Sequence, residues 1–294
     1  MTATGLRAAN AITLNDGRSM PLLGLGLMRF GGEDETAAVM RRGYDVGYRL
    51  FDTAAVYGNE QQTGDGIHAL PAGGADIFLT TKLWPNSYGM EKARPALERS
   101  LARLRVEAVD LYLIHWPMPE MDLYVETWQA LIAMREAGLA RSIGVSNFNP
   151  DHIERIIAET GVAPAVNQVE MHPYFQQAEL RKCHAKHGIV TQAWSPFGGG
   201  GRGNAGALLD DPVLVSIAEK HGKSAGQVVL RWLVQQDISV IPKATSEKHL
   251  RQNFEIFDFA LDEADLAAIA GLDRADGRLG PDPATLNKIA LEAD

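Results

Sequence analysis

Short apolar runs, each leading to residues able to do chemistry, recur along nearly the whole 294-residue chain. The residues at or just after the ends of these runs are Asp52, Lys82, His115, Ser146, Asn147, Gln168, Trp194, Ser195 and Lys243. Segments with helical periodicity separate the runs, so the chain contains about eight βα units in succession. This pattern predicts an α/β fold, the (β/α)8 TIM barrel, in which all strand ends meet at one mouth.

The remaining segments predict additions to this barrel. Asn15-Asp16-Gly17 predicts an N-terminal hairpin with a tight primed turn, placed to cover the barrel floor. Two extra helices are expected, since 212–221 and 262–270 are helical in pattern besides the regular units, and a Gly/Pro/Asp-rich C-terminal loop follows. No composition break marks a second domain. We therefore expect a disordered lead over 1–10 and a single domain over 11–294.

Charge and cysteine content narrow the class of partner. The net charge is −9 and no long basic run occurs, which argues against nucleic acid, although local basic residues can still hold an anionic cofactor. The single cysteine, Cys183, excludes an internal disulfide and is interpreted as a packing or surface residue. No apolar stretch approaches the roughly 20 residues that span a bilayer, and 1–10 lacks the apolar part of a secretory signal. These features predict a cytoplasmic monomer without a membrane partner.

Four residues at the ends of neighbouring predicted strands form an acid–base set. Asp52 and Tyr57 share the loop after the second strand, Lys82 ends the third, and His115 follows the fourth. Singly, each has an ordinary explanation, such as a helix cap, a solvated strand end or a structural histidine. Together they suit proton transfer, because a nearby Lys⁺ makes a phenol a better acid and a carboxylate can hold that lysine in place. Such a site protonates an oxyanion as hydride arrives at carbon.

Several longer motifs match one known family in order. They are FDTAAVYGNE, TTKLWP, LYLIHWP, RSIGVSNF, AVNQVEMHPY, QAWSPFG and VIPKATSEKHLRQNF. On these motifs the chain resembles an aldo-keto reductase over residues 12–259, and it is most similar to bacterial 2,5-diketo-D-gluconate reductase-like members. The resemblance implies an NADPH-dependent oxidoreductase that reduces diketo-gluconate, sugar-derived or small aliphatic or aromatic carbonyls to alcohols. Its catalytic tetrad would be Asp52, Tyr57, Lys82 and His115, with Tyr57 as general acid.

The resemblance also implies where the nicotinamide would lie. Ser146, Asn147 and Gln168 would hold its carboxamide, since their hydroxyl and amide groups match the donors and acceptors of that group. Trp194 would stack on the nicotinamide ring, and Ser195 would approach the pyrophosphate.

At the adenosine end the chain departs from the family pattern. The resemblance places the phosphate and adenine contacts on Lys243, Ser246, His249 and Asn253. Ala244 stands where the family usually has serine, and His249 stands where it usually has arginine. Arginine is always charged, whereas histidine is largely neutral at pH 7. We therefore expect NADPH as the cofactor, with NADH tolerated.

The substrate pocket is expected to be lined by Met28, Trp84 and Trp116, with Phe148 and Tyr174 as further candidates. The resembled family often has an aromatic residue at this position. Methionine is flexible, so Met28 favours a roomier pocket. The glycines of Gly24-Leu25-Gly26 lack the third glycine and the following helix of a dinucleotide fingerprint. We interpret them as close packing in the first strand.

No metal site is predicted from the histidines. His115, His172, His184 and His187 show no recognisable ligand spacing with carboxylates or thiolates, and His184 and His187 share a helix face without a third ligand. Two other functions stay open. The first is a nucleotide-sensing regulatory subunit of the same fold. The second is a barrel isomerase or aldolase that uses Lys82 as a Schiff base, which requires a lysine without an aspartate partner.

Overall fold

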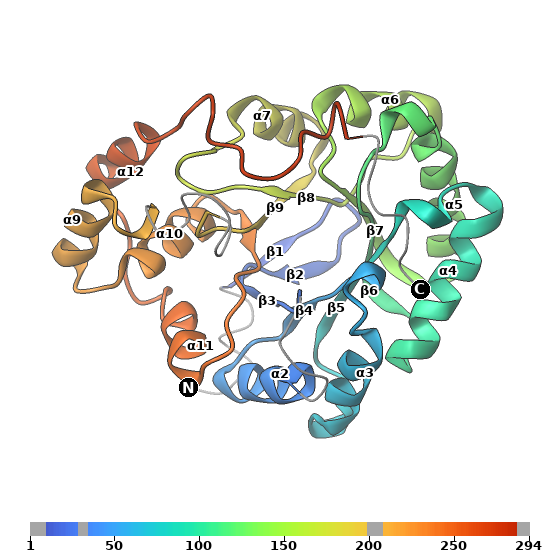
Figure 1. Ribbon diagram of the computed structural model, residues 1–294, viewed down its shortest axis with the longest axis horizontal. Coiled ribbons are helices and arrows are strands. Elements are labelled where there is room, and N and C mark those ends of the chain that lie inside the picture. Colours follow the sequence, from blue (N-terminus) through green and yellow to red (C-terminus); the bar gives the residue numbers. More distant parts are fainter. Residues whose placement is uncertain (1–9, 29–34, 199–207, 287–294) are drawn as a thin grey trace.

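The computed structural model describes residues 10–28, 35–198 and 208–286. Within them, eight parallel strands lie in chain order in one sheet, with helices around its outside (Figure 1). The strands are β3 (Gly24–Gly26), β4 (Leu50–Asp52), β5 (Phe78–Leu83), β6 (Val109–Ile114), β7 (Ala140–Ser146), β8 (Val166–Glu170), β9 (Val190–Trp194) and β10 (Ser239–Val240). A parallel bridge between Leu23 and Val240 joins the last strand to the first, so the predicted barrel closes.

In the described part of the chain, eight helices each follow a strand and cover the barrel. They are α2 (Glu35–Val46), α3 (Glu60–Ala69), α4 (Met90–Leu104), α5 (Tyr124–Glu136), α6 (Pro150–Thr160), α7 (Ala178–His187), α10 (Ala225–Val234) and α11 (Glu247–Phe254). The two extra helices, α9 (Pro212–His221) and α12 (Glu263–Ala270), lie beside each other on one side of the barrel (Figure 1). Short 3-10 turns complete the described elements, at η1 (Ala55–Tyr57), η2 (Pro71–Gly74), η3 (Pro85–Ser87) and η4 (Pro119–Met121).

Local chemistry sets the helix ends where the sequence predicts them. Asn149 caps α6, and Pro150 occupies its first turn, where a missing N–H costs nothing. His152 completes the cap, because its Nδ1 accepts from the Asn149 backbone N–H at 3.2 Å. Gly138 follows α5 with φ of +78° and donates its N–H to the Arg135 carbonyl, as expected for a helix stop.

The N-terminal hairpin packs against the barrel floor, as predicted. Its turn is not the two-residue primed turn that the sequence suggested. β1 (Ala11–Thr13) pairs antiparallel with β2 (Ser19–Pro21). Between them, the Leu14 N–H donates to the Arg18 carbonyl, and among the turn residues only Gly17 has positive φ, at +84°. A primed turn needs two such residues when it is of type I′, so this is a three-residue loop that ends in a left-handed glycine.

Two groups of buried apolar side chains form the core. The larger lies between the sheet and the helices, and the smaller joins hairpin residues Leu14 and Met20 to inward-facing strand residues. The first strand packs tightly, as predicted from its glycines. A Cβ at Gly24 would lie 2.2 Å from a Leu50 methyl group, and one at Gly26 would lie 2.9 Å from the Ile241 carbonyl oxygen.

The described part of the chain contains no helix that is long and apolar enough to cross a bilayer. The expected lead over 1–10 lies outside the described residues apart from position 10, and so does most of the glycine-rich stretch after β9.

Candidate active site

The acid–base residues come together at the C-terminal ends of β4, β5 and β6. Asp52 ends β4 and lies in register with Thr80, while Lys82 of β5 lies in register with Leu113, two residues before His115. Because the three strands are parallel neighbours, their ends share one rim of the barrel. The rim is buried, since Asp52 is 2 %, Lys82 0 % and His115 8 % exposed.

Tyr57 reaches the same rim from η1, which a buried asparagine fixes in place. The Thr53 hydroxyl donates to Asn59 Oδ1 at 2.7 Å, and Asn59 Nδ2 donates to the Leu27 carbonyl at 2.7 Å. Asn59 therefore ties the loop both to its own strand and to the neighbouring one. Gly58 closes η1 with φ of +67°, a conformation that few other residues adopt without strain.

Lys82 joins the members of this set. Its Nζ donates to Asp52 Oδ1 at 2.5 Å and to the Thr53 carbonyl at 2.9 Å, and it lies 3.5 Å from the Tyr57 hydroxyl. The His115 ring meets the Tyr57 ring edge to face, with centroids 5.9 Å apart. The structure thus brings all four predicted tetrad residues together.

The buried pair of Asp52 and Lys82 carries one negative and one positive charge. Burial raises the pKa of Asp52, and the charge of Lys82 and the hydrogen bonds from Lys82 and Gln168 oppose this rise. Burial lowers the pKa of Lys82, but the charge and hydrogen bonds of Asp52 and Tyr57 outweigh it, so that pKa is raised. At a contact of 2.5 Å the two groups form an ion pair, and Lys82 stays protonated beside the phenol.

His115 is neutral in this environment. Burial and then the charge of Lys82 bring its pKa well below the usual 6.5. A neutral imidazole can donate one N–H to an oxygen, but it is not a reservoir of protons near pH 7. Its Nδ1 has no hydrogen-bond partner among the described residues, and Trp84 packs edge to face against the ring with centroids 5.1 Å apart.

The residues predicted to hold a carboxamide lie directly beside this set. Ser146 of β7 lies in register with Gln168 of β8, and its hydroxyl donates to the Gln168 carbonyl at 2.8 Å. Gln168 Nε2 donates to Asp52 Oδ2 at 2.7 Å, so this amide contacts the tetrad itself. Asn147 adopts φ of +62°, and its Nδ2 donates to the His115 carbonyl at 3.0 Å.

Trp194 is held in a fixed orientation at the mouth. Its indole Nε1 donates to Asn147 Oδ1 at 2.9 Å, and the ring is only partly buried. Ser195 follows with φ of +51°, which is uncommon for serine and turns the chain sharply after β9. An oriented aromatic face beside amide and hydroxyl groups suits a flat heteroaromatic ring that carries a carboxamide.

A family model described as "Aldo/keto reductase family" matches residues 22–274 of the chain. The chain belongs to the aldo-keto reductase family. It is therefore an oxidoreductase, and the recognition made from the motifs is confirmed. The tetrad geometry also argues against a Schiff-base enzyme, because Lys82 is fully buried and paired with Asp52.

Individual relatives cover almost the whole chain. An aldo-keto reductase of Mycolicibacterium smegmatis is 48 % identical over 94 % of this chain and 98 % of its own length. Methylglyoxal reductase DkgA of Escherichia coli strain K12 is 42 % identical over 92 % of this chain and 96 % of its own. The crystal structure of a Gox0644 point mutant in complex with NADPH superposes with a TM-score of 0.88. It is 46 % identical and covers 94 % of this chain and 97 % of that chain.

The residues predicted for the adenosine end gather around the start of α11 in this aldo-keto reductase. Ser246 caps the helix, because its hydroxyl accepts the His249 backbone N–H at 3.2 Å. Lys243 and His249 are exposed, whereas Asn253 is 7 % exposed. The Ser246 hydroxyl is therefore engaged in the cap, and Lys243 is the cationic member of the predicted set that faces solvent.

The predicted substrate-pocket residues lie at different depths. Met28 follows β3 and is 48 % exposed, Trp84 is half-buried against His115, and Trp116 is 9 % exposed. Phe148 is fully buried between Tyr124 and His152, which makes it a core residue. Of the aromatic residues predicted to line the pocket, Trp84 and Trp116 therefore remain candidates.

Two polar residues near the site were missed by sequence reasoning. Gln192 Oε1 accepts from Gln168 Nε2 at 2.7 Å, and Gln192 Nε2 donates to the Ser239 hydroxyl at 3.1 Å. This chain of side chains extends the tetrad through Asp52 and Gln168 into the barrel interior. Gln192 lies two residues before the end of β9. This nearness to a strand end was the only sequence signal that it belongs near the site.

The second missed residue, Glu170, attaches the C-terminal segment to the barrel. It ends β8, is 1 % exposed, and accepts from His172 Nε2 at 3.0 Å and from the backbone N–H groups of Leu279 and Gly280, both at 2.8 Å. Burial raises the pKa of this carboxyl, but the hydrogen bonds outweigh that effect and lower the pKa. A Cβ at Gly280 would lie 2.8 Å from the Trp194 ring. The tail is therefore held against the Trp194 ring.

Proposed function

We propose that this aldo-keto reductase is an NADPH-dependent carbonyl reductase in which Tyr57 protonates the carbonyl oxygen. The observation that carries the proposal is the position of Lys82 Nζ, 2.5 Å from Asp52 Oδ1 and 3.5 Å from the Tyr57 hydroxyl. A buried ammonium at that distance stabilises the phenolate that remains after proton transfer. The neutral state of His115 supports the same assignment, because it leaves Tyr57 as the acid and His115 as a donor that orients the oxygen.

Bound NADPH would supply a hydride, two electrons and one proton, for the carbonyl carbon, and Tyr57 would supply the second proton to the oxygen. The products would be an alcohol and the oxidised nicotinamide. Ser146, Asn147 and Gln168 would bind the carboxamide, Trp194 would carry the ring, and Ser195 would lie toward the pyrophosphate. Their amide, hydroxyl and indole groups fit this cofactor, as the NADPH complex of the related Gox0644 structure supports.

For the substrate we propose small aldehydes and ketones, including α-oxoaldehydes such as methylglyoxal. The relatives named methylglyoxal reductase support this class. Trp84 and Trp116 would form the apolar wall of the pocket, and the exposed, flexible Met28 would leave room for substrates of different shape.

The test replaces the acid and keeps its ring. In Tyr57→Phe, NADPH oxidation by methylglyoxal should fall by on the order of 10² to 10⁴, with NADPH binding nearly unchanged. Tyr44→Phe serves as the matched control, because it removes a hydroxyl that donates to Asp76 on the outside of the barrel. Retention of more than about half of the activity in Tyr57→Phe would contradict the assignment of the acid.

A further inference from the structure

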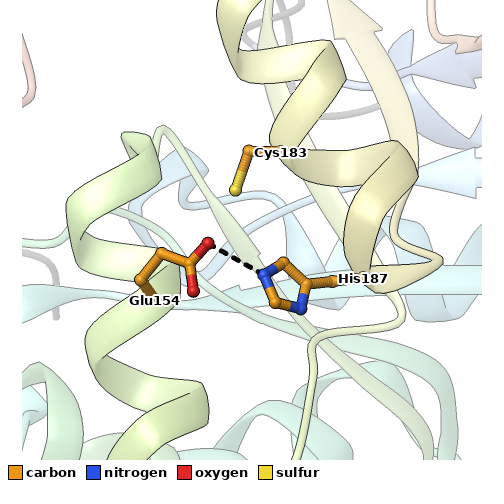
Figure 2. A group of neighbouring side chains, drawn as sticks. All are labelled: Glu154, Cys183 and His187. Atoms are coloured by element: carbon orange, nitrogen blue, oxygen red, sulfur yellow. Dashed lines mark hydrogen bonds and ion pairs between the residues drawn. The ribbon is translucent and has the colours of Figure 1, made fainter.

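Three metal-binding side chains meet on the outside of the barrel, between α6 and α7. Glu154 of α6 faces Cys183 and His187 of α7, and one ligand atom of each lies within 4.8 Å of the other two (Figure 2). Glu154 Oε1 and His187 Nε2 are already 3.0 Å apart. None of the three belongs to the proposed reductase site.

Helix geometry explains why these residues converge. Cys183 and His187 are four residues apart, so they lie on the same face of α7, one turn from each other. His184 points elsewhere: its Nδ1 contacts the Thr191 hydroxyl at 2.8 Å and its Nε2 contacts Asn167 Nδ2 at 2.9 Å. The histidine pair considered from the sequence therefore does not form. Cys183 takes the place of His184, and Glu154 supplies the third ligand from the neighbouring helix.

A thiolate, an imidazole and a carboxylate are the ligand types that Zn²⁺ binds. Around a tetrahedral Zn²⁺ such atoms lie about 3.3 to 3.5 Å apart, so closing the present arrangement needs a side-chain shift on the order of 1 Å. The Glu154 side chain is 46 % exposed, so it has room to move, whereas Cys183 is 9 % exposed.

We propose that Glu154, Cys183 and His187 bind Zn²⁺ and thereby link α6 to α7, with water in the fourth position. One side-chain charge changes when the ion binds. Cys183 gives up its thiol proton to solvent, and the thiolate and the Glu154 carboxylate together balance the ion. One proton is therefore released for each ion bound.

Lys186 competes for the same carboxylate, which provides a sharp test. Its Nζ donates to Glu154 Oε1 at 2.7 Å, so Zn²⁺ that binds through this oxygen displaces an ammonium group. Lys186→Ala removes that group and should tighten Zn²⁺ binding by about two- to fivefold, which corresponds to the strength of an exposed ion pair. Lys182→Ala is the matched control, since it removes the same charge from the same helix but from a lysine paired with Glu179.

The experiment uses the full-length protein after chelator treatment, titrated with Zn²⁺ against a chromophoric chelator and, separately, with Co²⁺. We expect one ion per chain, a thiolate-to-Co²⁺ charge-transfer band, and a rise of about 2–4 °C in melting temperature with excess Zn²⁺. Cys183→Ser, His187→Gln and Glu154→Gln should each weaken Zn²⁺ binding at least about tenfold. NADPH-dependent turnover should match the wild type in all three, which shows that the variants are folded.

Three results would overturn the proposal. They are the absence of stoichiometric Zn²⁺ binding, Zn²⁺ affinity in Cys183→Ser within twofold of the wild type, and binding in Lys186→Ala no tighter than in Lys182→Ala. His221→Gln is a further control, because His221 pairs with the Asp265 carboxylate at 2.7 Å on other helices and lies outside the group of Glu154, Cys183 and His187. Its Zn²⁺ affinity should equal that of the wild type.

Discussion

Replacing Lys82 and Asp52, singly and together, should distinguish what the buried ion pair contributes to stability from what it contributes to catalysis. Lys82→Met removes the ammonium while keeping an apolar side chain of similar length. It leaves Asp52, which is 2 % exposed, with one side-chain donor among the described residues, Gln168 Nε2 at 2.7 Å. Breaking a buried pair in this way costs about 3–5 kcal/mol, because a carboxylate stays in a low-dielectric interior without its counter-charge. The free energy of unfolding should fall by that amount near neutral pH.

Asp52→Asn should reduce both stability and turnover less than Lys82→Met does. Lys82 keeps its contacts with the Thr53 carbonyl at 2.9 Å and the Tyr57 hydroxyl at 3.5 Å, and an asparagine oxygen can still accept from it. In turnover, Lys82→Met loses a charge-assisted contact to the developing phenolate, worth roughly 1.5–3 kcal/mol, or about 10- to 150-fold. Asp52→Asn loses only the group that holds the lysine in position, so its decrease should be smaller.

The double variant Lys82→Met/Asp52→Asn decides between structural and catalytic roles. Replacing both members of a buried pair is often close to neutral, so urea unfolding should show most of the lost stability restored. The kcat/KM with NADPH and methylglyoxal should stay as low as in Lys82→Met. The reasoning is refuted if Asp52→Asn, shown to be folded, is the more damaging to turnover, or if the double variant regains activity along with stability.

Two further predictions concern the cofactor and pH. Lys243→Ala should weaken NADPH about tenfold or more and NADH little, because a charge-assisted contact to phosphate is worth roughly 1.5–3 kcal/mol, whereas His249→Arg should tighten NADPH alone. Quenching of tryptophan fluorescence measures both variants, and an equal loss for the two cofactors in Lys243→Ala would show that this lysine does not bind the 2′-phosphate. His184 is neutral when folded, because burial and then the charge of Arg181 lower its pKa from 6.5 to about 3. The unfolded chain therefore binds one more proton between these pH values. The free energy of unfolding should fall by on the order of 4 kcal/mol as pH drops across that window, and His184→Gln should show a slope one proton smaller in denaturant titrations.

The barrel and the tetrad could be predicted from the sequence because both follow from local periodicity and strand ends. Asp52, Lys82 and His115 each close an apolar run, and parallel strands bring such ends to one rim. Interactions across the barrel leave no such local mark. The hydrogen bond from Gln168 to Asp52 joins residues 116 positions apart, and the one from Gly280 to Glu170 joins residues 110 apart.

Side-chain direction is the other information that the sequence lacked. His184 and His187 share a helix, but one points into the protein and the other toward Glu154, and only the packing of α7 shows which is which. The hairpin turn is similar, because Asp16-Gly17 fits both a two-residue primed turn and a longer loop. The observed strand register corresponds to the longer, three-residue loop.

The attachment of the C-terminal segment has a consequence for how this enzyme could be altered. Glu170 holds the segment by two backbone N–H groups, which every residue except proline supplies. The contact with Glu170 therefore does not depend on most of the tail's side chains, but positions 277 and 280 are restricted to glycine by the Tyr174 carbonyl oxygen and the Trp194 ring. A tail from another member of the family could be grafted onto this barrel if it kept both glycines and the spacing to the strand-end carboxylate. The tail is thus attached through backbone groups, so that exposed side chains such as Leu279 can be exchanged without loss of the contact with Glu170.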